Sequence, residues 1–504
     1  MPVVVALDAG TTGVRALAVD EHADVVAVSY RELTQHFPAP GLVEHDAAEM
    51  WHLAEETLAE LADRLSAAGR TVAALGLTNQ RETAVAWDRR TAAPLCRCIV
   101  WQDRRTAARC RELEDKGMLP LVRERTGLVL DSYFSATKWE WMLSEGGVTR
   151  SASLALGTVD DWILWNLTGG ASGGRHATDH TNASRTLLYD LREGAWAEEL
   201  CDLFGVPRSA LGEIGPSAGR FGTVHRQVAG GAFAGVPVSG VAGDQQAALF
   251  GQACFEPGLA KVTYGTGSFV LLQAGGERPG TSEGLLTTVA WDLGDHAGDG
   301  PRVAYALEGS AFASGAAIQW LRDGLGIIAA APEVGPLAES VPDSGGVAVV
   351  PAFTGLGSPW WDPRARGTIT GITRGTGRAQ LARAVVEAMA FQVRDMVDAM
   401  TAATGRRCRE LRADGGAAVM DLLLQVQADQ VQVPVVRPRS TESTALGAAT
   451  LAGLGAGVWG STDELAALWK ADVERQPAVP AELADLAYAG WLRAVDKAGA
   501  WARR

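Results

Sequence analysis

The first thirty residues alternate between short apolar runs and turn-forming clusters. Val3 to Leu7 is continuous, apolar and rich in β-branched side chains, which predicts a buried strand. Val14 to Asp20 and Val25 to Arg31 predict two further strands, with turns at residues 8–13 and 21–24. Three strands joined by such short turns form an antiparallel meander and not a strand–helix–strand unit. The opening therefore differs from the usual nucleotide-binding openings.

Helical periodicity marks three later segments. Apolar residues recur every three or four positions in Trp51 to Ala68 and in Ala379 to Ala402, so both are predicted to be amphipathic helices. The small residues of Thr444 to Leu454 predict a helix that packs closely on a sheet. Thr71 to Leu77 returns to a strand pattern. Between about 168 and 230 the periodicity weakens while Gly, Ser and Pro increase, which predicts loops and short elements.

The second half of the chain repeats the opening pattern. Ala260 to Tyr264 predicts a strand, residues 265–268 a Gly-Thr-Gly-Ser turn, and Phe269 to Gln273 the return strand. The chain has 504 residues, more than the roughly 250–300 that one hydrophobic core serves. We therefore predict two domains, residues 1–252 and 253–504, each opening with a glycine–threonine hairpin.

The composition is that of an ordinary globular protein with an acidic surface. Hydrophobic residues make up 47% and charged residues 21%, and the formal net charge is −14. This charge disfavours non-specific binding to nucleic acid or to anionic membranes. It leaves room for a small anion in a local pocket built from backbone N–H groups and arginines.

The cysteines and the N-terminal sequence predict a cytoplasmic protein. The six cysteines form no CxxC pair and no HExxH motif accompanies them, which argues against zinc and predicts free thiols in a reducing compartment. We see no signal-peptide pattern, and no apolar run approaches the roughly 18 residues that a membrane helix needs.

The two glycine–threonine turns are candidate phosphate sites. Glycine lets backbone N–H groups approach a phosphate closely, and the hydroxyls of Thr11 and Thr12 add donors. Asp8 is placed to hold Mg²⁺ through water, and Arg15 to face the phosphates. The alternative is a plain strand reversal. No GxxxxGK[ST] motif occurs, and residues 265–267 lack the third glycine of a dinucleotide motif.

Two polar clusters at predicted strand ends are candidates for substrate binding. Asp244 follows the apolar run Val236 to Val241, where a carboxylate can act as a general base, although Gly-Asp is also common in surface turns. Asn79 to Thr83 follows another predicted strand. There Arg81 donates and Glu82 accepts hydrogen bonds, so together they can bracket adjacent alcohols. A surface ion pair is the alternative interpretation.

Two further features fit the same chemistry. Trp101 follows a strand-like segment. Its ring can pack against the carbon chain of a substrate or fill the hydrophobic core, and composition alone favours the core. The turn Asp414-Gly415-Gly416-Ala417 follows the strand-like run Glu410 to Ala413. Its two glycines would let a planar ring lie against the backbone, or they form a plain turn.

Together these pieces resemble the FGGY carbohydrate kinases, and within that family the members that act on glycerol. The similarity covers nearly the whole chain. It is carried by Asp8-Ala9-Gly10-Thr11-Thr12, residues 41–46 (GLVEHD), residues 79–83 (NQRET), Tyr133-Phe134-Ser135, residues 242–251 (AGDQQAALFG), Tyr264-Gly265-Thr266-Gly267, Ala306-Leu307-Glu308-Gly309 and residues 353–363 (FTGLGSPWWDP). The stretches 41–46 and 79–83 favour glycerol over xylulose, ribulose or gluconate.

The resemblance implies an α/β, actin-like fold, in which two ribonuclease-H-like domains enclose a cleft for nucleotide and substrate. It implies that the γ-phosphoryl group of ATP passes to glycerol, with Mg²⁺, to give sn-glycerol 3-phosphate in glycerol catabolism. Phosphoryl transfer needs positioning, charge neutralisation and a base. The resemblance assigns the base to Asp244, which with Asp8 is also a candidate metal ligand. It suggests a homo-oligomer, a dimer or tetramer.

The resemblance also implies binding residues. Those for glycerol are Arg81, Glu82, Trp101, Tyr133, Asp244, Gln245 and Phe269. Those for the nucleotide are Thr11, Thr12, Gly13, Arg15, Thr266, Gly309, Ala313, Gly416 and Met420. Two of them depart from the family pattern, because Gly13 stands where serine is usual and Met420 where an asparagine often contacts adenine. Losing a hydroxyl and an amide can change nucleotide affinity or base selectivity.

Two alternatives stay open at this point. One is a kinase of another small polyol or of a ketose. The other is an actin-like ATP-binding protein that works by conformational change and phosphorylates no metabolite. It gives no reason for Arg81, Glu82 and Trp101 to occur together, whereas a polyol pocket does.

Overall fold

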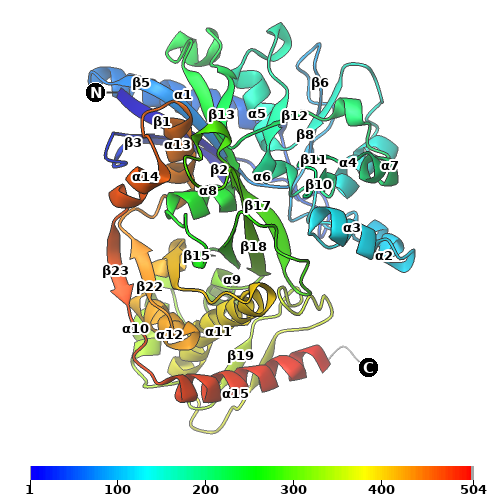
Figure 1. Cartoon of the computed structure of the whole chain (residues 1–504). Helices are drawn as coiled ribbons and strands as arrows, with labels where there is room; N and C mark the ends of the chain where they lie inside the picture. Colours follow the sequence, from blue (N-terminus) through cyan, green and yellow to red (C-terminus); the bar gives the residue numbers. More distant parts are fainter. Residues whose placement is uncertain (1, 501–504) are drawn as a thin grey trace.

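Two lobes, each built on a mixed β-sheet, make up the computed structural model, which describes residues 2–500 (Figure 1). The six-stranded sheet of the first lobe has the order β13-β14-β5-β1-β2-β3. The seven-stranded sheet of the second lobe has the order β17-β18-β16-β15-β21-β22-β23. The first sheet comprises β1 (Pro2–Ala9), β2 (Gly13–Val19), β3 (Val25–Glu32), β5 (Thr71–Asn79), β13 (Ala218–Thr223) and β14 (Pro237–Gly243). The second comprises β15 (Leu259–Tyr264), β16 (Ser268–Gly275), β17 (Leu286–Asp292), β18 (Val303–Ala311), β21 (Glu410–Asp414), β22 (Val435–Pro438) and β23 (Ala471–Arg475).

The three N-terminal strands form the predicted antiparallel meander. β1 pairs antiparallel with β2, and β2 with β3. Val3 to Leu7 is buried throughout, because successive side chains alternate between two covered faces. Helix α1 (Ala47–Ala67) covers one face, and helix α13 (Ser443–Gly455) covers the other. β5 and β14 add to β1 in parallel, so these three strands end at the same edge.

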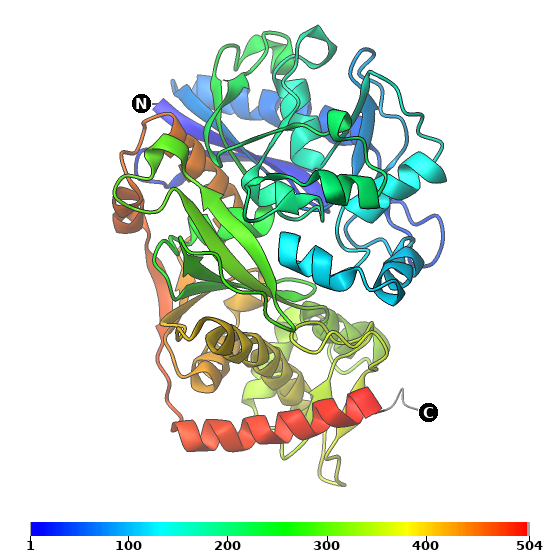
Figure 2. The same ribbon diagram turned by 45° about the vertical axis from the view of Figure 1, so that its right-hand side comes forward.

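Helix α13 crosses from the second half of the chain to the first sheet. It packs on β1, β5 and β14 and lies against α8 (Asp244–Gly251), as Figures 1 and 2 show in the orange-brown helix beside the blue strands. A Cβ on Gly76 of β5 would overlap the carbonyl oxygen of Ala448 in α13, and one on Gly447 would overlap that of Ala247 in α8. Only glycine allows this approach of backbone to backbone. The domain division after residue 252 separates the sheets but stays a prediction, since α13 crosses it.

Short elements make up the weakly patterned segment between residues 168 and 230, in agreement with the sequence. They include β9 (Ala177–Asp179), α6 (His180–Ala183), β10 (Tyr189–Asp190), β11 (Ala195–Trp196), α7 (Glu198–Leu203) and β12 (Glu213–Gly215). The long predicted helices are also present: the stripe of residues 379–402 lies in α11 (Arg378–Thr404), and its apolar side chains enter the core of the second lobe. Several boundaries differ: α1 begins at Ala47, four residues before the predicted Trp51, and β5 runs two residues beyond the predicted Leu77 and includes Asn79.

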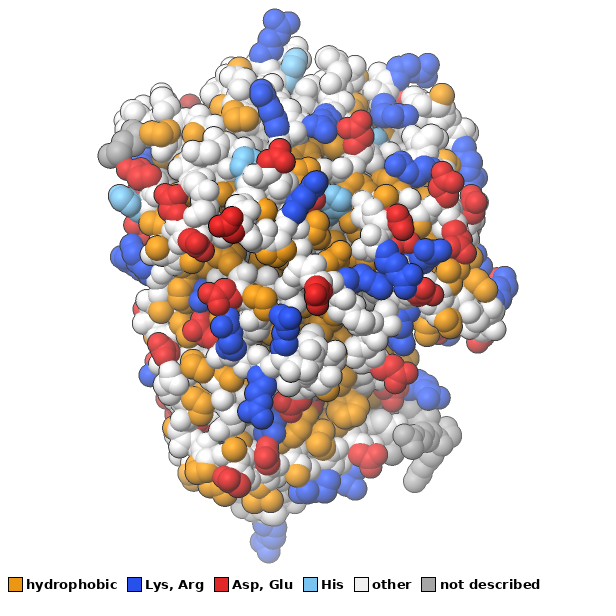
Figure 3. Space-filling view, in the orientation of Figure 1, with side chains coloured by type: hydrophobic (Ala, Val, Ile, Leu, Met, Phe, Trp, Pro, Cys, Tyr) orange, Lys and Arg blue, Asp and Glu red, His pale blue; other side chains and the backbone are white. Residues whose placement is uncertain are grey.

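The surface carries both signs of charge side by side. On the face in Figure 3, acidic and basic side chains are interspersed over both lobes. All six cysteines are free, and Cys96 is the least buried of them. Among the helices of residues 2–500, none combines the length and the apolar character that crossing a membrane requires.

The contact between α8 and α13 predicts a stability difference between two helical glycines. Gly447→Ala is expected to lower the free energy of unfolding by about 1–3 kcal/mol, because the added methyl group meets the backbone of Ala247. The matched control is Gly490→Ala in α15 (Ala481–Ala500), where the nearest atom lies 3.7 Å away on a flexible arginine. There helix propensity alone acts and favours alanine. Apparent melting temperatures at one scan rate check this, and equal values for both variants would contradict it.

Candidate active site

The ends of three parallel strands bring the predicted polar residues together. Ala9 of β1 pairs with Asn79 of β5, which in turn pairs with Gly243 of β14. Asp8, Arg81 and Asp244 therefore project from one edge of the first sheet. This is the edge at which ligands bind in open α/β sheets.

Aromatic side chains connect this edge to the second lobe. The indole N–H of Trp101 donates to Thr11 Oγ1 in the first hairpin over 3.0 Å. The ring of Trp101 meets those of Tyr133 and Phe269 edge to face, with centroids 5.7 and 6.3 Å apart. Phe269 belongs to β16, directly after the second hairpin. The three predicted aromatic residues thus form one wall between the two hairpins.

Arg81 is the centre of a buried ionic cluster. Its guanidinium donates two hydrogen bonds to Glu308 of β18, over 2.6 and 2.9 Å. It also donates to Gln246 over 3.1 Å and to the hydroxyl of Tyr133 over 3.3 Å. Its Nε lies 3.2 Å from Asp244 Oδ1. Arg81 therefore joins the edge of the first sheet to a strand of the second.

Arg185 completes the cluster. It donates to Glu82 Oε1 over 2.7 Å and to Glu308 Oε1 over 3.1 Å. Two guanidinium groups thus meet two carboxylates, and none of the four side chains is more than 2% exposed. Burial would raise the pKa of Glu308, but Arg185 and Arg81 outweigh it and hold this pKa at about 2. At Glu82 burial prevails over the same two arginines and raises the pKa.

The backbone of Glu82 is strained. Its φ of +60° lies in the left-handed region, which is uncommon for a glutamate and occurs where the surroundings enforce it. The carbonyl oxygen of Glu82 accepts hydrogen bonds from Ser135 Oγ and Lys138 Nζ, both over 3.1 Å. Lys138 also donates to the carbonyl of Tyr133 over 2.6 Å. Burial lowers the pKa of Lys138 to about 7. These buried donors fix the position from which the Glu82 carboxylate extends.

Two carboxyl groups with raised pKa values lie at the open part of the edge. Asp244 is the first residue of α8, and its side chain is 30% exposed. Burial raises the pKa of Asp244, while Arg81 and Lys261 oppose the change. Burial raises the pKa of Asp8 to about 7; Arg15 opposes this rise and Asp244 adds to it. A pair of neighbouring carboxylates of this kind suits a proton acceptor beside a cation.

Lys261 reaches the same place from β15 of the second lobe. It is buried and donates to the side-chain oxygen of Gln245 and, over 2.9 Å, to Thr263 Oγ1. Thr263 donates in turn to Asp414 over 2.6 Å. Burial lowers the pKa of Lys261 to about 8, an effect that Asp414 opposes. Because the amide oxygen of Gln245 accepts from Lys261, its NH₂ group is left to donate to a ligand.

A cavity of about 610 Å³ adjoins the second hairpin, and we call it the hairpin cavity. Of the predicted nucleotide residues, Thr266, Gly416 and Met420 line it. Its other walls include the apolar side chains of Ile318 and Val334. The size and the largely apolar lining suit a flat ring system.

The first hairpin explains the glycine at position 13. A Cβ on Gly13 would collide with the carbonyl oxygen of Arg31 and lie 2.5 Å from the ring of Tyr30. The hydroxyl of Tyr30 donates to the carbonyl oxygen of Thr12 over 3.2 Å. A serine does not fit at position 13 while Tyr30 occupies this place.

Six predicted nucleotide residues lie outside the hairpin cavity: the three of the first hairpin (residues 11–13), and Arg15, Gly309 and Ala313. Arg15 forms an ion pair with Glu442, which precedes α13. Gly309 lies inside β18, where a Cβ would press on Met396. Ala313 is buried and its carbonyl accepts a hydrogen bond from a glutamine of α11 over 3.2 Å. Their assignment to the nucleotide stays a prediction.

Three residues that hold the site together were not predicted individually. Glu308 and Lys261 are single charged residues within otherwise apolar strand segments, a signal that the sequence offers. Arg185 falls in the weakly patterned segment and has no such signal. Its role follows from the folded structure alone.

Comparison with known proteins identifies relatives along the whole chain. Residues 3–251 match the N-terminal domain, and residues 260–456 the C-terminal domain, of the FGGY family of carbohydrate kinases. A glycerol kinase of Trichlorobacter lovleyi is 52% identical over 510 residues, covering 100% of both chains. A glycerol kinase of Carboxydothermus hydrogenoformans is 49% identical over 502 residues, covering 99% of this chain and 98% of the relative.

Solved structures agree with these sequence matches. Plasmodium falciparum glycerol kinase with ADP superposes with a TM-score of 0.92 at 32% identity, covering 99% of this chain and 98% of the other. A gluconate kinase of Lactobacillus acidophilus has a TM-score of 0.88 at 19% identity, which shows a shared fold. The predicted two-domain, actin-like α/β fold is confirmed.

The buried cluster predicts a strong effect of removing one charge. Arg185→Met is expected to lower the free energy of unfolding by about 3–5 kcal/mol, because it leaves Glu82 and Glu308 with the single guanidinium of Arg81. The double variant R185M/E308Q also removes one of these acids, and it is expected to recover part of the lost free energy of unfolding.

Apparent melting temperatures of the two single variants and the double variant measure this coupling. Arg208→Met, at an exposed position, is the control and is expected to melt like the wild type. Losses that simply add in the double variant would show that the two residues do not interact.

Proposed function

The chain belongs to the FGGY family of carbohydrate kinases, and we propose that its reaction, transfer of the γ-phosphoryl group of ATP to glycerol, uses Asp244 as the base between the two hairpins. The observation that supports this best is the place of Asp244. Its carboxylate lies 3.2 Å from Arg81 Nε, at the sheet edge that also carries Asp8. The product is sn-glycerol 3-phosphate.

The cluster around Arg81 supports its role in binding the glycerol hydroxyls. Arg81 Nε is buried and finds no hydrogen-bond acceptor of good geometry among the described residues. Glu82 accepts from Arg185 through Oε1, which leaves Oε2 for a ligand. A hydroxyl can therefore accept from Arg81 and donate to Glu82. The NH₂ group of Gln245 is a third contact.

The aromatic wall supports binding of the carbon chain. Trp101, Tyr133 and Phe269 present ring edges and faces next to these polar groups. A three-carbon triol has C–H groups on one side and hydroxyls on the other. The wall and the ionic cluster match these two sides and fix the orientation of the substrate.

The chemical step needs a proton acceptor and positive charge. The terminal hydroxyl oxygen of glycerol attacks the γ-phosphorus, so a new P–O bond forms while the bond to the bridging oxygen of ADP breaks. The hydroxyl proton passes to the carboxylate of Asp244 and from there to water. Burial, by raising the pKa of Asp244, makes it a better acceptor. Closure of the lobes would keep water from competing with glycerol.

The acidic groups at this edge fit a magnesium ion. Burial and the charge of Asp244 raise the pKa of Asp8, and a divalent cation held by Asp8 and Asp244 would stabilise the ionised carboxylates. Among residues 2–500, no three His, Cys, Asp or Glu side chains form a metal-binding group, so phosphate oxygens and water would supply the other ligands. When bound, the ion neutralises charge on the phosphate oxygens.

The hairpin cavity supports a place for adenosine. Thr266 and Gly416 line it together with Met420, whose thioether can pack against a ring but offers it no strong hydrogen bond. The triphosphate would then extend toward the first hairpin at Thr11, Thr12 and Gly13. We propose in addition, from the family resemblance, a cytoplasmic homo-oligomer, either a dimer or a tetramer.

The alternative functions are not favoured. Relatives that are half identical along the whole chain are glycerol kinases, whereas the gluconate kinase shares only the fold. A non-metabolic ATP-binding protein gives no reason for the ionic cluster around Arg81, whose hydrogen-bond donors and acceptors suit a polyol.

Substrate dependence tests the reaction, and Asp244→Asn tests the base. We expect ADP formation to depend on glycerol and to be slower with dihydroxyacetone, erythritol or xylulose. D244N is expected to lower kcat by about 10²–10⁴-fold with an unchanged circular dichroism spectrum, because an amide does not accept the proton. Asp202→Asn, at an exposed position, is the control. Equal ATP turnover with and without every polyol would refute the kinase assignment, and wild-type turnover in D244N would refute the base.

Lys261 is expected to act as a positioning residue through Gln245. Lys261→Met frees the Gln245 amide to rotate, which should raise the KM for glycerol about tenfold and leave the KM for ATP unchanged. Thr263→Val, which removes the other hydrogen bond of Lys261, is the control and should change the glycerol KM less. Steady-state kinetics with each substrate varied in turn distinguish the two. A parallel rise of both KM values in K261M would indicate general damage to the cleft.

A further inference from the structure

A short buried helix, α6, lies against the sheet edge that carries the site residues. It contacts β14 of the first sheet and β17 of the second. Its N-cap residue Asp179 and the polar residues Thr181 and Asn182 are at most 1% exposed. None of them was predicted to bind glycerol, nucleotide or metal. The proposed reaction therefore gives these buried polar side chains no role.

The carboxylate of Asp179 is fixed by hydrogen bonds to both of its oxygens. Oδ1 accepts from Thr181 Oγ1 over 2.8 Å, and from the backbone and side-chain N–H groups of Asn182 over 2.9 and 3.0 Å. Oδ2 accepts from the backbone N–H of Thr181 over 2.9 Å and from Ser217 Oγ over 2.6 Å. A buried carboxylate with this many donors has one orientation, and it orients the groups that donate to it.

The hydroxyl of Thr181 connects Asp179 to the base. It has a single proton, which it donates to Asp179, so its oxygen is left to accept. The donor to this oxygen is the backbone N–H of Gly243, over 2.9 Å. Gly243 is the N-cap residue of α8 and directly precedes Asp244. Thr181 thus fixes the point at which the chain turns from β14 into α8, from which the Asp244 side chain extends.

The same short helix also supports the strand that leads to Arg81. Asn182 Oδ1 accepts from Asn79 Nδ2 over 3.0 Å, and Asn79 is the last residue of β5. The side chain of Arg81 lies on the backbone of Gly243, since an added Cβ there would come within 2.6 Å of Arg81 Cγ. The ends of β5 and β14 therefore share one support.

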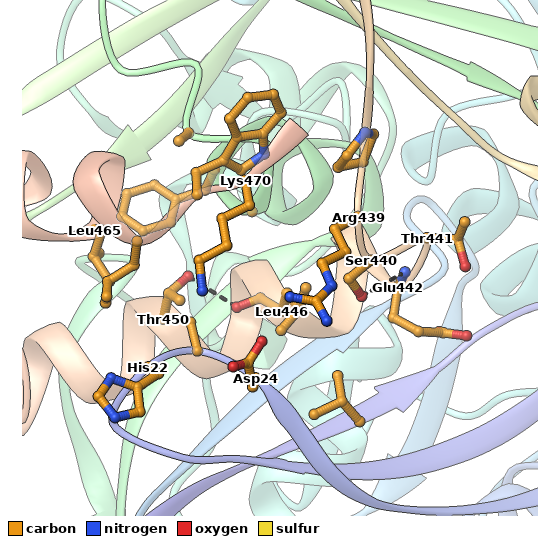
Figure 4. A pocket seen from close by; sticks show the side chains of 18 of the residues that line it. His22, Asp24, Arg439, Ser440, Thr441, Glu442, Leu446, Thr450, Leu465 and Lys470 are labelled. Carbon is orange, nitrogen blue, oxygen red and sulfur yellow. Dashed lines mark hydrogen bonds between the residues drawn. The ribbon is translucent and has the colours of Figure 1, made fainter. Parts of the chain in front are cut away.

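The other end of α8 borders a cavity. Phe250 and Gly251 line a space of about 520 Å³, which Figure 4 shows together with Leu446 and Thr450 of α13. Protein atoms pack less completely around this end of α8 than around its N-terminal end. The position of Asp244 therefore depends on the contacts at the N-terminal end.

We propose that Thr181, oriented by Asp179, is a positioning residue for phosphoryl transfer and holds the carboxylate of Asp244 at the reacting hydroxyl through the backbone of Gly243. This inference rests on the proposed role of Asp244 as the base. A base acts only within hydrogen-bond reach of the proton that it takes, and a misplacement of about 1 Å can cost about 10²-fold in rate. Thr181 acts through Gly243 and not on the nucleotide, so its effect falls on the chemical step.

A series of variants at position 181 tests the role of the hydroxyl. Thr181→Val keeps the shape of the side chain but leaves the Gly243 N–H without its acceptor. The rate constant of phosphoryl transfer, measured in a single turnover, is expected to fall at least about tenfold, with an unchanged KM for ATP. Thr181→Ser keeps the hydroxyl and should recover most of the rate. Thr181→Cys, a weaker acceptor, should lie between them, and it replaces T181V if the valine variant does not fold.

Thr126→Val is the matched control. Thr126 ends α3 (Leu119–Thr126), away from the site, and is 1% exposed. Its hydroxyl likewise accepts from a backbone N–H, that of Leu128 over 3.1 Å, and donates to the carbonyl of Val122 over 2.7 Å. T126V and T181V should lower the melting temperature alike, while T126V keeps the wild-type transfer rate. A wild-type rate in T181V, or an equal loss of rate in both variants, would overturn the positioning role.

The double variant T181V/D244N separates positioning of the base from general damage. If Thr181 acts through the carboxylate of Asp244, its replacement costs little once that carboxylate is gone, so the double variant should be about as slow as D244N. A further loss by the factor that T181V causes alone would overturn the inference. A wild-type rate in D244N would instead refute Asp244 as the base, so failure of the proposed function is distinct from failure of the positioning role.

Discussion

The paired hydrogen bonds between Arg81 and Glu308 are the interaction on which the cleft depends. Arg81 follows a strand of the first sheet, and Glu308 lies on a strand of the second, so one buried ion pair sets the relative position of the lobes at the site. The same guanidinium contacts Tyr133 and lies next to Asp244. Such a buried pair is retained at a site because breaking it leaves an uncompensated charge, which ties the geometry of the substrate pocket to the contact between the lobes.

Around this pair the two sides of the cleft differ in kind. On the glycerol side the groups are charged, buried and fixed by several hydrogen bonds each, which suits a small substrate recognised by its hydroxyls. On the nucleotide side the hairpin cavity is lined largely by apolar groups and glycines, which suits a ring recognised by shape. Lys261 is placed between the two, since it contacts Gln245 on one side and, through Thr263, Asp414 at the end of β21 on the other.

Local patterns were sufficient to predict the strands of both hairpins and the long helices, because alternation and 3.6-residue periodicity report directly which face is buried. The strand ends located Asp8, Arg81 and Asp244, because a turn after a buried strand is readable in the sequence. The partners that stabilise them could not be read in this way. Arg185 and Glu308 are more than 100 residues apart in the chain and meet only when the lobes assemble. Likewise, small residues predicted that α13 packs on a sheet, but not on which one.

The packing of α13 on the first sheet affects how the chain folds during its synthesis. The face of the first sheet that carries Val4 and Ala6 is covered by α13, which is synthesised roughly 200 residues after β14. At a translation rate of about 5–20 residues per second, α13 is synthesised about 10–40 s after β14, and this face of the sheet stays uncovered during that interval. During this time the nascent N-terminal half presents an apolar surface at the ribosome, and its solubility there depends on a chaperone or on a state that is not yet fully folded.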